Sequence, residues 1–525
     1  MQTVVGELYL FSKIKYGVNS KHVPIYEFKP LSPLFHSIKV ASTYGKKYGA
    51  QENIYVVVEY DEVCEKGNII EILGPISSPE AGFMAIQIRH LGYMGHLRSR
   101  KKEKRVLSET TASLPSTHHG NESDYGLLEK NDNICILASV DPAGCQDIDD
   151  VISFSKREST IGVHIADVSS VVKRDSELDK WFRLQPATLY RPDGQVFHSL
   201  PSQFATEQCS LRQNEIRNVI SVFFTIEKNE NGEITNVSTK VKESKIRSSA
   251  QLTYDEADTL LQTHPDWQAF SGLIAQWNTW LASSQEDPIE SHTMIAFLMI
   301  QANAYVANIL TQYAKKTNQY TLLRSHQHNI ESESATPTKQ MQWASACAEY
   351  VCTQDPVKHC ALNLSCYTHF TSPIRRYADV AVHRMLKCYL HSAVSCEEMS
   401  KEKLTLLTDE LNRYMRQQHR AEIEWDWWWN VACNQSQTLI HEKTQIHATV
   451  IHWSICDTFG VSVLLWFETM KRNAWVRAIH PKLMKDIQIT NNETSLELVS
   501  TEMEMNVIFK RGDDVCVQWW WNIEK

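Results

Sequence analysis

The 525-residue sequence predicts a multidomain protein of the α/β plus β class, in which a central mixed α/β domain is flanked by small β-barrels. Short runs of alternating apolar and polar residues fill the first hundred positions, long helical patterns fill the middle, and strand-like runs return near the C-terminus. Hydrophobic residues make up 42% and charged residues 22% of the chain, an ordinary profile for a globular protein.

Residues 1–97 are predicted to form the first barrel. The runs 53–59 and 67–73 alternate apolar and polar side chains and are bounded by Gly and Pro turns. Residues 98–131 are interpreted as a mobile linker, because apolar periodicity disappears and Ser, Thr, Lys, Glu and Gly dominate. The basic run from Arg98 to Arg105 fits phosphate contact, nuclear import or a solvated linker, and the linker is preferred.

Residues 132–440 are predicted to form the central domain, and 441–525 a degenerate second barrel. The central range has a strand signal at 218–226 and helical patterns at 255–316 and 401–429. The tryptophan clusters at 425–429 and 519–521 fit either base stacking or domain packing, and packing is favoured because adjacent side chains point in different directions.

Four aspartates fall within ten residues, at Asp141, Asp147, Asp149 and Asp150. Carboxylates about 4 Å apart repel by roughly 4 kcal/mol per pair at an effective dielectric of about 20, so such a cluster favours a divalent cation. Hard oxygen ligands without a His or Cys pattern favour Mg²⁺ or Mn²⁺, which can assist phosphodiester cleavage. A calcium loop starting at Asp147 is excluded, because Ile152 stands where Gly is required. The alternative is a solvated acidic turn.

A second segment, residues 367–384, combines aromatic residues, a turn and two arginines. Pro373 suits the first turn of a helix, with Thr371 or Ser372 as its cap. Arg375 and Arg376 would then lie near the helix N-terminus, where phosphate binds readily. We interpret this pair as an anion clamp, with a solvated helix face as the alternative.

Together the two segments resemble the RNB family, the RNase II-like exoribonucleases that degrade RNA from its 3′ end, and most of all the branch of the exosome catalytic subunit. The similarity extends over about 141–384, with further matches at 162–168, Tyr190, 200–201, 209–211, Arg217 and 323–326. We expect the chain to lack that branch's N-terminal endonuclease domain, which makes tethering to an exosome doubtful.

The resemblance implies an RNB catalytic domain between OB-fold barrels. It implies that the four aspartates hold one or two Mg²⁺ ions, with Mn²⁺ as the other possible ion, and that Asp149 and Arg375 are catalytic. It further implies RNA contacts by Tyr190, which would stack on a base, and by His164 and Arg376. Ala296 and Phe297 replace a Glu pair of the family, so we expect altered anchoring of the RNA end.

The expected function is 3′ to 5′ hydrolysis of single-stranded RNA to nucleoside 5′-monophosphates. The alternatives are a catalytically inactive RNB scaffold that binds RNA, and an endonuclease. A net charge of −9 argues against broad duplex binding but is compatible with RNA threaded through a channel. We expect a monomer without membrane contact, and association with an RNA-decay complex is left open as a further partner. Thirteen cysteines without Cys-x-x-Cys spacing, and no signal peptide, indicate a reducing compartment, either nucleus or cytoplasm.

Overall fold

The computed structural model describes residues 2–12, 14, 16–32, 34–44, 52–61, 66–93, 100–113, 126–282, 290–326, 348–429, 444–456, 460–467, 472–479, 487–491, 495–500, 505–510 and 512–519. These residues divide into two compact units. The first contains the described parts of 1–93 and 418–525, and the second those of 94–327 and 348–417.

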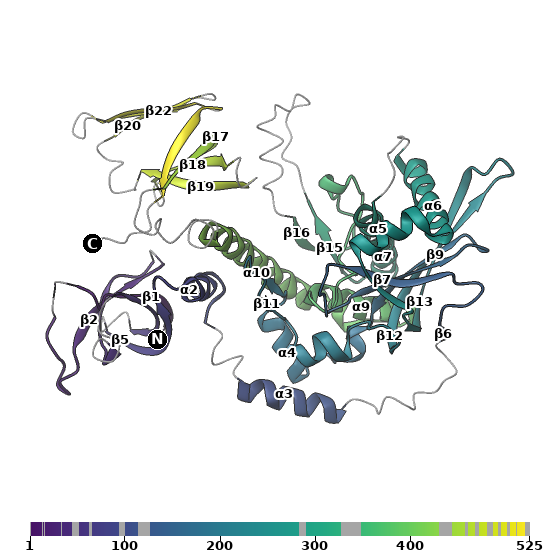
Figure 1. The fold of residues 1–525 in the computed structure, drawn as a ribbon, viewed down its shortest axis with the longest axis horizontal. Helices are drawn as coiled ribbons and strands as arrows, with labels where there is room; N and C mark the ends of the chain where they lie inside the picture. The colour runs from purple at the N-terminus through teal and green to yellow at the C-terminus, as the bar shows by residue number, and fades with distance from the viewer. Residues whose placement is uncertain are drawn as a thin grey trace. The chain divides into compact units, whose positions relative to one another are not determined.

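The N-terminal strands form a closed five-stranded barrel, which confirms the predicted fold (Figure 1). Its order is β1-β2-β3-β5-β4, with β1 Gln2–Leu8, β2 Ile25–Pro30, β3 Ile38–Ala41, β4 Ile54–Asp61 and β5 Lys66–Pro75. Leu8, Phe28 and Val56 fill its interior, as the alternating pattern requires. Gly6 is needed at the contact with β2, because a Cβ there would lie 2.3 Å from the carbonyl oxygen of Lys29.

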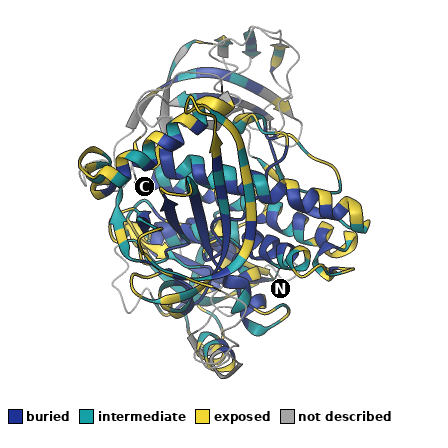
Figure 2. Cartoon of the chain, turned by 90° about the vertical axis from the view of Figure 1, so that its right-hand side faces the viewer, coloured by how far each residue is buried: buried dark blue, intermediate teal, exposed yellow. Residues whose placement is uncertain are grey.

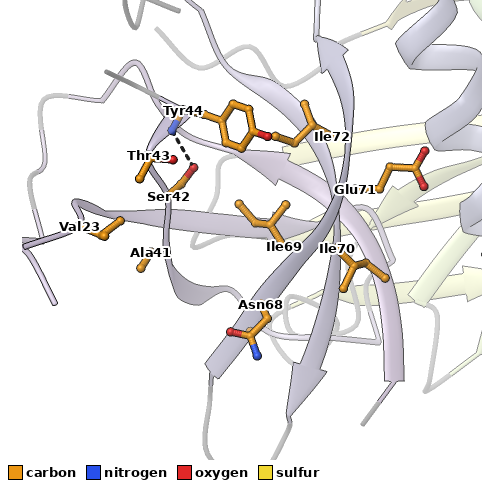
Figure 3. Close-up of a pocket in the computed structure, with 11 residues that line it drawn as sticks. Val23, Ala41, Ser42, Thr43, Tyr44, Asn68, Ile69, Ile70, Glu71 and Ile72 are labelled. Atoms are coloured by element: carbon orange, nitrogen blue, oxygen red, sulfur yellow. Dashed lines mark hydrogen bonds between the residues drawn. The ribbon is translucent and has the colours of Figure 1, made fainter. Parts of the chain in front are cut away.

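Strands β3 and β5 close the barrel through a single parallel pair, Lys39 with Lys66. Beyond this pair the two strands separate and leave a cavity of about 450 Å³ (Figure 3). Figure 3 shows Tyr44 on one side of it and Ile69 and Ile72 on the other. The cavity is therefore a consequence of incomplete pairing at this seam of the barrel.

Helix α2, Pro79–Leu91, packs against the barrel and against the last turns of α10, Lys401–Trp428. Ser78 caps α2 by accepting a hydrogen bond from the Ala81 N–H. The indole N–H of the fully buried Trp425 donates to the carbonyl oxygen of Phe83 at 3.0 Å, and that of Trp428 donates to Pro79 at 3.1 Å. The packing role predicted for this cluster is confirmed for these two tryptophans, whereas residues 520–521 lie outside the described part.

The second unit is built on a seven-stranded sheet of order β14-β7-β8-β9-β12-β13-β6. The strands are β6 Leu127–Leu128, β7 Ile136–Asp141, β8 Asp150–Ser155, β9 Thr160–Ala166, β12 Ile216–Lys228, β13 Ile234–Arg247 and β14 Ala250–Thr253. The two outermost pairs, β14 with β7 and β13 with β6, are parallel and the other pairs antiparallel. Figure 2 shows the central strands buried along most of their length.

Helices cover one face of this sheet and form the largest core. They are α5 Tyr254–Thr263, α6 Pro265–Ala282, α7 Ser291–Thr317, α9 Tyr377–Leu390 and the first part of α10. A capping box between Thr253 and Glu256 fixes the start of α5. Helix α7 is long and apolar enough to span a membrane by length and composition alone, but Leu298, Val306 and Leu310 are buried in this core.

A smaller core lies on the other face, where α4, Glu177–Leu184, contributes Leu178 and Phe182. Two short pairs complete the unit, β10 Leu189–Tyr190 with β11 Val196–Phe197, and β15 Thr321–Ser325 with β16 Glu349–Thr353. Short helical turns are η1 Val168–Ser170, η2 Phe204–Gln208, η3 Cys360–Leu362 and η4 Glu397–Met399.

The C-terminal strands form two sheets, of order β19-β18-β17-β23 and β20-β21-β22. They are β17 Thr444–Cys456, β18 Gly460–Phe467, β19 Arg472–Ile479, β20 Gln488–Asn491, β21 Ser495–Ser500, β22 Met505–Lys510 and β23 Asp514–Trp519. Val450 and Val463 of one sheet share a core with Leu496 and Leu498 of the other. The predicted C-terminal β domain is therefore present.

Part of the range interpreted as a linker is helical, as α3, Arg100–Ser113. Its sequence lacks an apolar stripe but is rich in Arg, Lys and Glu, which favour helix. Arg105 pairs with Glu109 one turn later at 3.0 Å, and Val106 is buried in the smaller core. Its buried side chains, Val106 and Thr110, are one turn apart, but one of them is polar, so they give no apolar periodicity.

We predict that replacing Trp425 by alanine destabilises the packing of α10 on α2. The substitution removes a fully buried indole and leaves the Phe83 carbonyl without its donor, at a cost of about 3–5 kcal/mol. Hydrogen exchange at the amides of α2 should become faster. Leu406→Ala, which changes a 64% exposed side chain of the same helix, should leave that exchange unchanged. Equal protection of α2 in both variants would refute the prediction.

Candidate functional site

The four aspartates lie on the connection between two adjacent strands. Asp141 ends β7 and Asp150 begins β8, so the connecting loop brings Asp147 and Asp149 to the same end of the sheet. The Ile148 N–H donates to the Ser210 hydroxyl at 3.1 Å, and this hydroxyl donates to the Gln146 carbonyl at 2.8 Å. The loop is therefore held in place by a side chain from outside it.

Asp149 joins this acidic loop to the arginine segment. One carboxylate oxygen, Oδ1, accepts the Ile374 N–H at 2.7 Å, and Oδ2 accepts the Arg375 Nε–H at 3.2 Å. Asp149 is 4% exposed, and burial raises its pKa well above the ordinary value although Arg375 opposes the shift. The two predicted catalytic residues are therefore in direct contact.

The negative charges of Asp141 and Asp150 are less well balanced by nearby cations than that of Asp149. Burial raises the pKa of both carboxyls, and the charge of Asp147 adds to the effect on Asp141, as the charge of Asp141 does on Asp150. Oδ2 of Asp141 is buried without a hydrogen bond in the described part of the chain. Buried oxygens that lack a donor and carboxyls that raise one another's pKa fit a hard divalent cation.

The carboxylates do not form a closed ligand set. Within the described residues, no three His, Cys, Asp or Glu side chains are close enough together to hold an ion. Both oxygens of Asp149 are engaged by the arginine segment, although each retains a second lone pair. The predicted metal ligands thus have suitable chemistry and a shared location, and their metal role remains a prediction.

Tyr190 lies beside the acidic loop on the β10–β11 hairpin. Its side chain is 45% exposed and its hydroxyl donates to Oδ2 of Asp147 at 3.4 Å. Burial of the hydroxyl and the charge of Asp147 raise its pKa, so the phenol stays protonated. His198, which the sequence analysis did not single out, has its Nδ1 3.8 Å from the same oxygen. Only its place directly after the hairpin could have pointed to it.

Arg375 lies in a turn before α9 rather than in a helix. The predicted helix start at Pro373 is wrong, because α9 begins at Tyr377 with Arg376 as its N-cap. The Arg375 carbonyl accepts the Thr188 N–H at 2.9 Å, which fixes the backbone. Its side chain is 47% exposed and retains N–H groups that can reach a phosphate.

Arg376 is engaged within the protein. Its Nε and Nη2 donate to the two oxygens of Asp379 at 2.9 and 3.0 Å, and Asp379 is fully buried. Asp379 Oδ1 also accepts the Ser372 N–H at 2.8 Å. The pair braces the turn that carries Arg375, and the predicted RNA contact of Arg376 would have to compete with it.

The prediction that His164 contacts RNA is wrong. This residue is fully buried in the middle strand β9, where Nδ1 and Nε2 hydrogen bond to the hydroxyls of Ser221 and Ser153, each at 2.8 Å. Burial lowers its pKa to about 3, so the ring is neutral. His164 is a core histidine whose two partners come from the neighbouring strands β12 and β8.

Phe297, at the position where the family has an acidic residue, is half-buried on α7 and packs edge to face on Trp277 of α6, with ring centroids 5.1 Å apart. The aromatic substitution is therefore used for helix packing. This contact gives the expected change in RNA anchoring no direct support.

The RNB domain family matches residues 132–271 and 271–392. Ribonuclease R of Chlamydia pneumoniae is 28% identical over 383 residues, which cover 61% of this chain and 54% of that protein. Exosome complex exonuclease RRP44 of Mus musculus is 28% identical over 367 residues, covering 55% of this chain and 37% of that protein. The chain spans about half the length of the ribonuclease R sequences that it matches.

Solved structures of low sequence identity share the fold. The apo form of Mycoplasma genitalium RNase R gives a TM-score of 0.71 at 17% identity and covers 98% of this chain and 87% of its own. Yeast Ssd1, described as a pseudonuclease, gives 0.65 at 19% identity and covers 95% and 67%. These structures show the fold, and the matched RNB domain, which contains the acidic and arginine segments, establishes that the chain belongs to the RNB family.

Proposed function

We propose that this chain is a Mg²⁺-dependent 3′ to 5′ exoribonuclease that hydrolyses single-stranded RNA to nucleoside 5′-monophosphates. The observation that carries the proposal is the contact between Asp149 and the Arg375 segment, which places an acidic loop and a half-exposed arginine in one site. Relatives named ribonuclease R and exosome exonuclease support it. Mycoplasma genitalium RNase R in complex with ribose-methylated single-stranded RNA, which shares the fold with a TM-score of 0.69, supports an RNA ligand.

In the proposed reaction, different side chains of the site bind the metal, the phosphate and the base. Nucleases of this family generally use divalent metals, and Asp141, Asp147, Asp149 and Asp150 would hold them. Such ions, when bound, activate a water molecule and stabilise the leaving oxygen. Arg375 would bind a phosphate oxygen and stabilise the charge that develops there. Tyr190 would stack on a base without regard to its identity, as an exonuclease without sequence preference requires.

The runner-up function is an inactive RNB protein that binds RNA as a scaffold. Similarity to Ssd1, described as a pseudonuclease, favours this reading. The retained aspartates oppose it, because buried carboxyls that raise one another's pKa are costly and a scaffold does not need them. Action as a monomer, association with an RNA-decay complex, and residence in the nucleus or cytoplasm remain part of the proposal.

The first prediction for this function is Mg²⁺-dependent shortening of RNA. Incubation with labelled single-stranded RNA should give a ladder that ends in nucleoside monophosphates, and EDTA should abolish it. Asp150→Asn should slow the reaction at least about 100-fold, because it removes a charge from the predicted metal set. Asp132→Asn, an exposed aspartate of the same unit, is the matched control. RNA that is bound but never shortened would support the inactive scaffold. Cuts inside the RNA strand would instead support an endonuclease.

The second prediction concerns Tyr190. Loss of a stacked base in Tyr190→Ala should weaken RNA binding by roughly 5- to 150-fold, from about 1–3 kcal/mol per base. Tyr190→Phe should bind nearly as tightly as the wild type, since it keeps the ring and loses only the 3.4 Å hydrogen bond to Asp147. Fluorescence anisotropy in EDTA measures binding without cleavage. Equal affinity of the alanine variant and the wild type would exclude stacking at this position.

A further inference from the structure

Arg324 lies outside the proposed catalytic residues, on the two-stranded sheet of β15 and β16 in the second unit. Arg324 of β15 stands directly opposite Tyr350 of β16. Its guanidinium carbon lies 4.5 Å from the centre of the Tyr350 ring. Stacking on an aromatic face holds the plane of a guanidinium while leaving its edge available for hydrogen bonds.

A continuous wall of rings extends from this stacked pair. Tyr350 contacts His369, with centroids 5.6 Å apart and its hydroxyl 2.7 Å from Nδ1 of the ring. The wall continues through Tyr367, 5.9 Å from His369, to His359, 5.1 Å from Tyr367, and ends where His326 stacks on His359 at 5.5 Å. These rings are mostly buried, and they hold the partly exposed Arg324 in a fixed position.

Arg324 differs from the two neighbouring arginines in its charge balance. Arg375 pairs with Asp149 and Arg376 pairs with Asp379. Arg324 has no ion pair within the described residues, and its Nη1 is buried without a hydrogen-bond acceptor there. A half-buried cation without a counter-charge is costly, so its geometry favours an anionic ligand.

Arg324 is linked through the backbone to the segment that carries Arg375. The backbone N–H of Arg324 donates to the carbonyl oxygen of Tyr367 at 2.8 Å, in the segment that leads into the Arg375 turn. His369, in that segment, has a pKa well below its ordinary value because of burial and of the charges of Arg376, Arg324 and Arg375 around it. Several positive groups thus converge on one ring, close to the proposed site.

We propose that Arg324 is the centre of a second phosphate subsite, which binds a backbone phosphate of the same RNA strand as the one that Arg375 contacts. The inference rests on the proposed function for its ligand but not on cleavage. A phosphodiester is the anion that fits, because the edge of a guanidinium matches two phosphate oxygens. An RNA strand with one phosphate at Arg375 would then place another of its phosphates at Arg324.

The test measures RNA binding in EDTA, by fluorescence anisotropy over a range of NaCl concentrations. Arg324→Gln should weaken binding at least about 10-fold, the usual scale for hydrogen bonds to a charged group. The slope of log K against log salt should fall by about 0.7, the value for one phosphate contact on a single strand. Arg157→Gln, an exposed arginine on the β8–β9 turn of the same unit, should change neither quantity.

Arg324→Lys provides a second variant if the glutamine variant fails to fold. It should keep the salt slope of the wild type while losing affinity, because an ammonium retains the charge but not the two-pronged geometry. RNA carrying a neutral methylphosphonate at one linkage at a time then locates the phosphate. One linkage should weaken binding to the wild type and have no further effect on binding to Arg324→Gln.

An unchanged slope and affinity in Arg324→Gln would overturn the proposal, as would a methylphosphonate profile identical in the wild type and the variant. Failure of the proposed function is a separate outcome. If RNA is never shortened but the salt slope falls as expected, the subsite stands and the chain is a scaffold. If RNA is shortened with no contribution from Arg324, the exonuclease stands without this subsite.

Discussion

The contact of Asp149 with Ile374 and Arg375 determines the arrangement of the site. It joins the loop before β8 to the turn before α9. The two residues that Asp149 contacts lie 225 and 226 positions further along the sequence. A buried carboxylate without such partners would cost several kcal/mol, so the two segments are stable only together. This contact sets the position of Arg375 relative to the other three aspartates. Arg375 and the acidic loop could act on one phosphate only because of it.

Features with a short repeat could be predicted from the sequence. The strand pattern at 53–59 corresponds to β4, Ile54–Asp61, and the helical pattern at 401–429 to α10, Lys401–Trp428. The clustering of the aspartates was visible because all four lie within ten residues of the sequence. Their contact with Arg375 was not, since no spacing rule relates residues so far apart, and only the resemblance to a family connected them.

The wrong predictions share a physical cause, which is that polar side chains satisfied one another inside the protein. The family resemblance implied an RNA contact for His164, yet serines on both neighbouring strands bind its two nitrogens. The helix was expected to start at Pro373, but Asp379 accepts both the Ser372 N–H and the Arg376 side chain and so stabilises a turn instead. Local propensity could not anticipate partners supplied by the tertiary structure.

The charges of the two segments indicate where the proposed cation would matter most. Arg375 compensates Asp149, whereas Asp141 and Asp150 have raised pKa values because burial and neighbouring carboxylates oppose their ionisation. A phosphodiester brought to the same place would add another negative charge and increase this repulsion. A divalent ion bound as proposed would reverse this balance, because it would favour the ionised carboxylates and attract the phosphate. The proposed metal would therefore matter for the phosphate beside the acidic loop, whereas base and phosphate contacts elsewhere on the strand would not depend on it.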